Sequence, residues 1–218
     1  MWADQSPAEN DATQVDPTRR PTLVPAGSAG GLPTHALVRF DNTQFLSVSD
    51  DVTLRWSAHD FALYTVVRFT NPLSEWTIVY GKWTDVGPDY PGLFLWANYP
   101  NTVVTPVGFT GFVGRVDAMR IASAPGPFND NALRVVGLRR IGNTLQIRIN
   151  GTLIGSSNVS GFNSALFDAV GRPAFIGGRP EGGQAFHGGI SELIGVRGTL
   201  TDSEVVQLET YLKTKFEL

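Results

Sequence analysis

Apolar residues in this chain mostly alternate with polar ones or stand in short runs, and glycine, proline, asparagine and aspartate separate the runs. Val, Ile, Phe and Tyr are frequent in these runs, which is typical of β-strands rather than helices. The run at 61–69 has the length of a central strand. The pattern predicts a mostly β protein with strands at residues 36–40, 45–48, 61–69, 76–80, 92–97, 134–139, 145–149, 153–155, 173–178 and 186–196.

One hairpin is indicated by its turn. Asn150-Gly151 stands between the alternating runs at 145–149 and 153–155. Both residue types tolerate the positive φ that a two-residue hairpin turn requires. We therefore expect these two runs to pair as antiparallel neighbours.

One helix is predicted at the end of the chain, over residues 201–215. Thr201 and Glu204 have the spacing of a capping box, which marks a helix start. The apolar residues that follow recur at helical spacing and predict a face that packs on the sandwich. They are Val205, Val206, Leu208, Leu212 and Phe216.

Residues 1–35 predict an irregular N-terminal arm, because prolines recur there and periodic apolar positions are few. We expect the arm to wrap the domain and to add at most one strand edge. Residues 36–200 then form the sandwich, and the 218 residues make one domain. The prolines of the arm are Pro7, Pro17, Pro21, Pro25 and Pro33.

Composition narrows the function classes. The chain has 17 Lys and Arg against 20 Asp and Glu, a formal net charge of −3, so nothing in its charge favours nucleic acid or an anionic membrane as partner. It has no cysteine, which excludes disulfides and thiolate metal sites. No signal-peptide pattern opens it and no apolar run is long enough for a transmembrane helix, so we expect no membrane insertion.

Several segments carry a resemblance to a known family. The most telling ones are 175–178, 186–194 and 200–204 near the end, the hairpin at 145–155, the runs 38–41 and 45–48, and the lead-in at 2–6, 12–14 and 20–23. Together they resemble laminin-G-like, concanavalin A-like lectin domains of bacterial or phage type. The resemblance implies an all-β, two-sheet antiparallel jelly-roll sandwich with one C-terminal helix. Family roles include sugar binding, adhesion, particle surfaces and several enzymes.

Catalytic patterns are missing from the sequence. Hydrolases of this fold use paired carboxylates on one strand, and no predicted strand carries such a pair. Asp202 and Glu204 suit the helix start, where they complement its dipole. Glu192 lies in a predicted strand and could face inward, yet it stands alone. We predict no catalytic residue.

A cluster of aromatic and polar residues in the middle of the chain is the candidate ligand site. Aromatic rings stack on sugars while amides and carboxylates take the hydroxyls. The alternative is that Trp76 and Trp96 are core residues and that Trp83 and Tyr90 cover them. His187 is added because its glycine neighbours allow backbone to approach a ligand. The candidate ligand-binding residues are Trp83, Asp85, Asp89, Tyr90, Asn98, Tyr99 and His187.

Calcium is a candidate cofactor, and no other is indicated. Asp85 and Asp89 stand four residues apart in a predicted loop, and Asn129-Asp130-Asn131 is a second oxygen-rich turn. Calcium takes six to eight oxygen ligands of this type. The alternative is that these residues are ordinary turn formers.

The sequence thus favours a non-catalytic carbohydrate-binding or adhesion module. We expect it to bind a glycan or cell-surface polysaccharide and to belong to a larger secreted or phage protein, located outside the cell, on a cell surface or on a virion. One alternative is a structural decoration protein that contacts the protein subunits of an assembly. Another is a glycan-processing hydrolase or lyase whose acids meet only in space.

Overall fold

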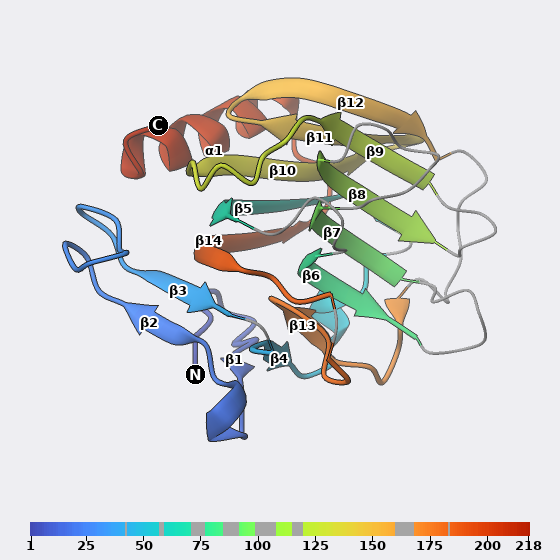
Figure 1. The fold of residues 1–218 in the computed structure, drawn as a ribbon. Coiled ribbons are helices and arrows are strands. Elements are labelled where there is room, and N and C mark those ends of the chain that lie inside the picture. The colour runs from blue at the N-terminus through green and yellow to red at the C-terminus, as the bar shows by residue number, and fades with distance from the viewer. Residues whose placement is uncertain are drawn as a thin grey trace.

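A computed structural model describes most of the chain and contains two antiparallel sheets and one α-helix (Figure 1). The described residues are 1–41, 43–56, 59–70, 77–84, 92–98, 108–114, 120–159, 168–182 and 184–218. The predicted fold class is confirmed: the protein is an all-β, two-sheet sandwich with a C-terminal helix.

Each sheet has seven strands in the described residues. The first sheet has the order β1 (Ala12–Thr13), β4 (Leu46–Val48), β13 (Ala174–Ile176), β6 (Thr77–Trp83), β7 (Gly92–Asn98), β8 (Gly108–Gly114), β9 (Arg120–Pro125). The second has the order β12 (Thr152–Asn158), β11 (Thr144–Ile149), β10 (Arg134–Ile141), β5 (Phe61–Phe69), β14 (Gly188–Arg197), β3 (Leu37–Phe40), β2 (Thr22–Val24). We call them sheet A and sheet B.

The predicted long strand is confirmed as the centre of sheet B. β5 lies between β10 and β14 and is buried on both faces, which explains why its sequence is apolar almost throughout. Leu63 and Val67 face sheet A and join the main core between the sheets. Tyr64 and Val66 face the other way and pack in a second core with the C-terminal helix.

The predicted hairpin is confirmed. β11 and β12 pair through Ile149 and Thr152, and the turn residues Asn150 and Gly151 have φ of 50° and 89°. Two further strands, β8 and β9, are missing from the sequence prediction. Glycine and small residues occupy much of both strands, so their hydrophobic alternation is weak.

The expectation that the N-terminal arm adds at most one strand edge is wrong. In the structure the arm adds an edge strand to each sheet. β1 pairs with β4 at the edge of sheet A, and β2 pairs with β3 at the edge of sheet B. Two or three residues are too few to show a strand pattern in the sequence. Between them, Pro17–Arg19 form a short 3₁₀ helix, η1.

The C-terminal helix α1 (Asp202–Lys215) is confirmed together with its capping box. Val205 and Leu212 are buried against sheet B. Val206 is 55% exposed, so its predicted packing role is wrong: it lies on the outer side of the helix, next to the buried Val205. Helical spacing alone did not separate these two neighbours.

The buried face of α1 carries an acid that the hydrophobic pattern does not reveal. Glu209 is 2% exposed, and its carboxylate accepts hydrogen bonds from Arg148 at 2.7 and 3.0 Å and from the Tyr64 hydroxyl at 3.1 Å. A buried carboxylate is stable only when it is paired in this way. Burial, together with the Glu209 charge, raises the pKa of Tyr64, which keeps its hydroxyl as a donor.

We predict that Glu209→Ala lowers the free energy of unfolding by about 3 kcal/mol, because it leaves the Arg148 charge poorly compensated beneath the helix. Urea denaturation at pH 7 measures the change. Gln207→Ala, an exposed position on the same helix, is the matched control and should change stability by less than about 0.5 kcal/mol. Equal effects of the two substitutions would contradict the assigned role of Glu209.

Candidate functional site

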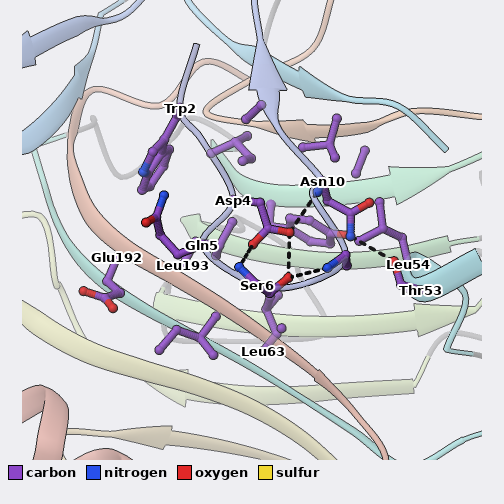
Figure 2. A pocket seen from close by; sticks show the side chains of 18 of the residues that line it. Trp2, Asp4, Gln5, Ser6, Asn10, Thr53, Leu54, Leu63, Glu192 and Leu193 are labelled. Carbon is purple, nitrogen blue, oxygen red and sulfur yellow. Dashed lines mark hydrogen bonds between the residues drawn. The ribbon is translucent and has the colours of Figure 1, made fainter. Parts of the chain in front are cut away.

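A pocket of about 640 Å³ opens beside the N-terminal segment Trp2–Ala12, which we call the N-terminal loop (Figure 2). The strands of sheet A contribute Val48, Tyr80 and Ile176 to its lining, and β5 of sheet B contributes Leu63. The volume lies within the roughly 300–1,000 Å³ common for small-molecule sites.

The pocket reaches the edge of β14 where β3 stops. β3 pairs with Gly188–Ile190 only, so in the described residues Glu192–Arg197 pair with β5 alone. This leaves the other edge of the strand without a strand partner, and the N-terminal loop lies beside it (Figure 2). Backbone groups on such an edge are available for hydrogen bonding.

Hydrogen bonds hold the N-terminal loop in a closed shape. Its ends form a bridge, with Trp2 and Ala12 exchanging N–H···O bonds of 2.8 and 2.9 Å. In the middle, the Asp4 carboxylate accepts from the Ser6 amide, the Ser6 hydroxyl and the Asn10 amide, each at 2.8 Å. Burial raises the pKa of Asp4, but these hydrogen bonds outweigh it and hold the pKa below its usual value.

One side of the pocket is formed by residues next to a 3₁₀ helix, η2 (Val52–Leu54). The Asn10 side chain donates to Thr53 Oγ1 at 2.8 Å and ties the N-terminal loop to η2. Trp56 donates from its ring nitrogen to the Thr53 carbonyl at 2.6 Å. Its ring stacks on Tyr80, with centroids 6.2 Å apart and an angle of 11°. Two aromatic side chains that pack against each other therefore belong to the lining of the pocket.

A network around Asp50 fixes this segment to sheet A. Asp50 accepts from Arg55 at 2.6 Å, from the buried Lys82 ammonium at 3.0 Å and from the Gly171 amide at 2.6 Å. Burial works to raise the pKa of Asp50, but these donors outweigh it and lower the pKa to about 2. Lys82 also donates to the Asp168 and Ala169 carbonyls.

Two buried hydroxyls in the pocket lining have no hydrogen-bond partner among the described residues. One belongs to Tyr80, which is 4% exposed. The other belongs to Ser191, the extra residue of a β-bulge between Ile190 and Glu192 in β14. Bulges often re-aim a side chain towards a site. An unpartnered buried hydroxyl is costly, so each is a candidate contact for a ligand.

The charged side chains of the pocket already have partners. Glu192 accepts from the Lys215 ammonium at 2.6 Å, and Asp4 has the three donors described above. Arg197 is exposed and hydrogen-bonds to His59 at 2.6 Å. Glu192, the acid of the predicted strand, is thus engaged by a lysine.

The structure does not place Trp83 as expected, with its ring exposed for stacking on a sugar. It ends β6, is 5% exposed, and stacks on Phe94 with ring centroids 5.2 Å apart. Trp96 is equally buried in the same cluster, on the face of sheet A that points away from the main core. The Arg179 guanidinium lies over the Trp83 ring at 5.3 Å. Trp83 and Trp96 are therefore both packing residues, which is the alternative to a role in ligand binding.

The remaining predicted ligand residues are not brought together in the described structure. His187 precedes β14 in sheet B, and its Nδ1 lies 3.3 Å from the Asp41 carboxylate. Asn98 ends β7 in sheet A. Asp85, Asp89, Tyr90 and Tyr99 lie outside the described residues.

The second oxygen-rich turn is occupied by an arginine. Both Asp130 carboxylate oxygens accept from Arg134 at 2.7 Å, and one also accepts from the Ala132 amide at 3.0 Å. A cation there would have to displace the guanidinium. Across the described ranges no three His, Asp or Glu residues gather as a metal site. The Asp85 and Asp89 pair stays a prediction.

Sequence reasoning missed the residues that make the pocket. Trp2, Trp56, Tyr80 and Ser191 come from four separate segments of the chain. Trp2 and Ser191 lie in segments that carry the family resemblance, but nothing in their spacing marks them as parts of one site. A weak signal was present: Trp2 and Trp56 are isolated aromatic residues in otherwise polar stretches.

Comparison with known proteins finds the same fold in solved structures of low sequence identity. No protein-family model and no curated protein sequence matches the chain. The binding domain of Paraclostridial Mosquitocidal Protein 1 is similar in structure, with a TM-score of 0.66 and 12% identity over 96% of this chain and 49% of that one. The chain therefore spans about half the length of that relative.

Two further neighbours were solved with saccharides. Domain 4 of AbnA, a GH43 extracellular arabinanase from Geobacillus stearothermophilus, in complex with arabinotriose, has a TM-score of 0.60 and 14% identity over 86% of this chain and 81% of that one. The Ruminococcus gnavus IT-sialidase CBM40 bound to α2,3-sialyllactose has a TM-score of 0.57 and 15% identity over 79% and 96%. At these identities the likeness is one of fold.

Within the described residues no helix has the length and apolar composition to cross a membrane.

We predict that Asp4→Ala loosens the N-terminal loop without unfolding the sandwich. The amides of Ser6 and Asn10 lose their acceptor, so their hydrogen exchange should accelerate by about ten-fold or more. Exchange measured by NMR tests this. Glu9→Gln, an exposed neighbour, is the control. Unchanged protection of both amides would show that Asp4 does not hold the loop.

We predict that Asp50→Asn lowers the free energy of unfolding by about 2 kcal/mol at pH 7, from the difference between pKa values of 3.8 and about 2. The folded-state pKa is depressed, so this stability is present above pH about 4 and is lost as the pH falls towards 2. Denaturation curves of wild type and variant should therefore converge in acid. Asp51→Asn, which keeps an η2 cap, is the control. A gap independent of pH would contradict the assignment.

Proposed function

We propose that this protein is a non-catalytic carbohydrate-binding module. The observation that carries the proposal is the pocket beside the N-terminal loop, where the rings of Trp2, Trp56 and Tyr80 line the same space as the unpartnered hydroxyls of Tyr80 and Ser191. Sugars present apolar ring faces and hydroxyl groups, and this lining offers partners for both.

The comparisons support this reading through the fold. Domains of similar structure were solved with arabinotriose and with α2,3-sialyllactose, so the sandwich is a scaffold on which saccharides bind. Catalysis is disfavoured by the acids of the pocket, because Asp4 and Glu192 are both committed to local hydrogen bonds. A hydrolase needs two carboxyl groups that are available to the scissile bond.

A second place for binding is the region of the predicted ligand residues. Asp85, Asp89, Tyr90, Asn98 and Tyr99 supply aromatic and oxygen groups that suit a glycan or calcium. His187 stays a separate candidate beside sheet B, whereas Trp83 is packed against Phe94 and is not proposed as a ligand contact. We place the module in a larger protein that acts outside the cell, at a cell surface or on a virion, where polysaccharides are met.

We expect the purified chain to bind saccharides on a glycan array, screened with and without calcium. Trp2→Ala should lower the signal by about ten-fold if the pocket binds, because a stacking ring is lost. Tyr90→Ala and Tyr99→Ala probe the second region, and Val206→Ala is the control, since Val206 is 55% exposed on the outer side of α1 and does not line the pocket. Thermal denaturation of each variant verifies folding.

If the folded protein binds no saccharide on a broad array with calcium present, the proposal is contradicted. That result would instead favour the structural alternative, in which the surface of the domain contacts protein subunits of an assembly.

A further inference from the structure

The hydroxyls of Tyr80 and Ser191 are uncharged groups that can both donate and accept. Their oxygen atoms are buried, and neither has a partner in the described residues. Elsewhere in the protein the buried Tyr64 hydroxyl donates to Glu209. Leaving a hydroxyl without a partner costs free energy that a core phenylalanine or alanine would not, so the two groups in the pocket need an explanation.

In the described lining the charged groups other than Arg197 already have charged or hydrogen-bonding partners, and Arg197 itself is exposed. Glu192 and Lys215 neutralise each other at 2.6 Å, and the Asp4 carboxylate is surrounded by its own donors. Arg197 is exposed and bonded to His59, so its charge is hydrated rather than directed at a buried partner. A carboxylate brought to the buried Tyr80 hydroxyl would lose its water, and the described lining holds no buried cation without an acidic partner to compensate for that loss, which is strongly unfavourable.

From these observations we infer that the pocket selects uncharged saccharides over acidic ones, with Tyr80 Oη and Ser191 Oγ as the hydrogen-bonding groups that hold a sugar hydroxyl. This inference rests on the proposed function and specifies the ligand class and the contact residues of the same site. The Trp56 ring, stacked on Tyr80, contributes to the apolar surface around the tyrosine hydroxyl.

The bulge supports the role of Ser191. Ile190 pairs with Val67 and Glu192 pairs with Val66, so Ser191 has no cross-strand partner of its own. The residue is not needed to continue the ladder, and its side chain lies at the pocket, on the strand edge that β3 leaves open. A position that interrupts strand pairing and carries an unpartnered hydroxyl beside a cavity is suited to binding rather than to packing.

The test combines the array with titration calorimetry on the full chain. The probes are arabinotriose, the neutral oligosaccharides that bind on the array, and α2,3-sialyllactose as the acidic saccharide. Tyr80→Phe and Ser191→Ala each remove one hydroxyl and little else. The control substitutions are Thr210→Val on α1 and Ser156→Ala on β12, which each remove a hydroxyl at an exposed position outside the pocket lining.

We expect neutral saccharides to bind more tightly than sialyllactose. Each of Tyr80→Phe and Ser191→Ala should weaken neutral binding by about three- to ten-fold, while the controls leave it unchanged. The melting temperature of the ligand-free variants should stay level or rise, because an unpartnered buried hydroxyl is removed. Lost affinity therefore cannot be attributed to unfolding.

The outcomes separate this inference from the proposed function. If saccharides bind but the two hydroxyl variants match their controls, the pocket assignment is overturned and the binding module stands. If sialylated saccharides bind in preference, the selection of neutral sugars is overturned. If no saccharide binds at all, both proposals are overturned.

Discussion

The N-terminal arm pairs with both sheets, and the rest of the structure at that flank depends on this pairing. β1 hydrogen-bonds to β4 in sheet A, and β2 hydrogen-bonds to β3 in sheet B, so residues 14–21 have to pass from one sheet to the other. Ordering an irregular segment costs about 1–2 kcal/mol per residue. Backbone pairing at both ends, together with the Asp4 hydrogen bonds, offsets part of that cost and gives the pocket a defined wall.

Two buried tyrosines on opposite sides of sheet B differ in whether their hydroxyl groups have hydrogen-bond partners. Tyr64 faces α1, where its hydroxyl donates to Glu209 and Arg148 completes a satisfied network. Tyr80 faces the space between the sheets, where its hydroxyl has no described partner. On the helix side, the buried Glu209 carboxylate is compensated by Arg148 and Tyr64, which stabilises the packing of α1. The pocket side retains hydrogen-bonding capacity that the fold itself does not use.

Much of the fold could be predicted because its signals are local. The apolar run of β5, the Asn150-Gly151 turn and the Thr201 capping box each encode an element within a few residues, and the structure has all three. The edge strands of the arm could not be predicted, because strands of two or three residues carry no period. β8 and β9 were missed because their glycines and small residues weaken the alternation. At Gly111 in β8, a Cβ would lie 2.0 Å from Leu138 of the facing sheet, so close approach of the sheets requires glycine there.

The candidate site could not be predicted for a different reason. Its residues meet only when the N-terminal loop, η2, β6 and β14 come together, and no spacing along the chain records that. Aromatic content guided the sequence analysis to Trp83, which proved to be packed against Phe94. Polarity and aromaticity identify residue types suited to a ligand, but only the folded arrangement decides which of them line a cavity, as Trp56 and Tyr80 do and Trp83 does not.

The bulge at Ser191 has a consequence for how the chain tolerates changes in length. Ile190 and Leu193 both contact the main core, whereas Ile194 packs with the helix side. Removing residue 191 would restore strict alternation between Ile190 and Leu193, so every neighbouring side chain would keep its face. Deletion of Ser191 would therefore leave the packing of the core unchanged and would remove only the hydroxyl group. In a strand of this kind, the insertion or deletion of one residue can add or remove a binding group while the neighbouring side chains keep their faces.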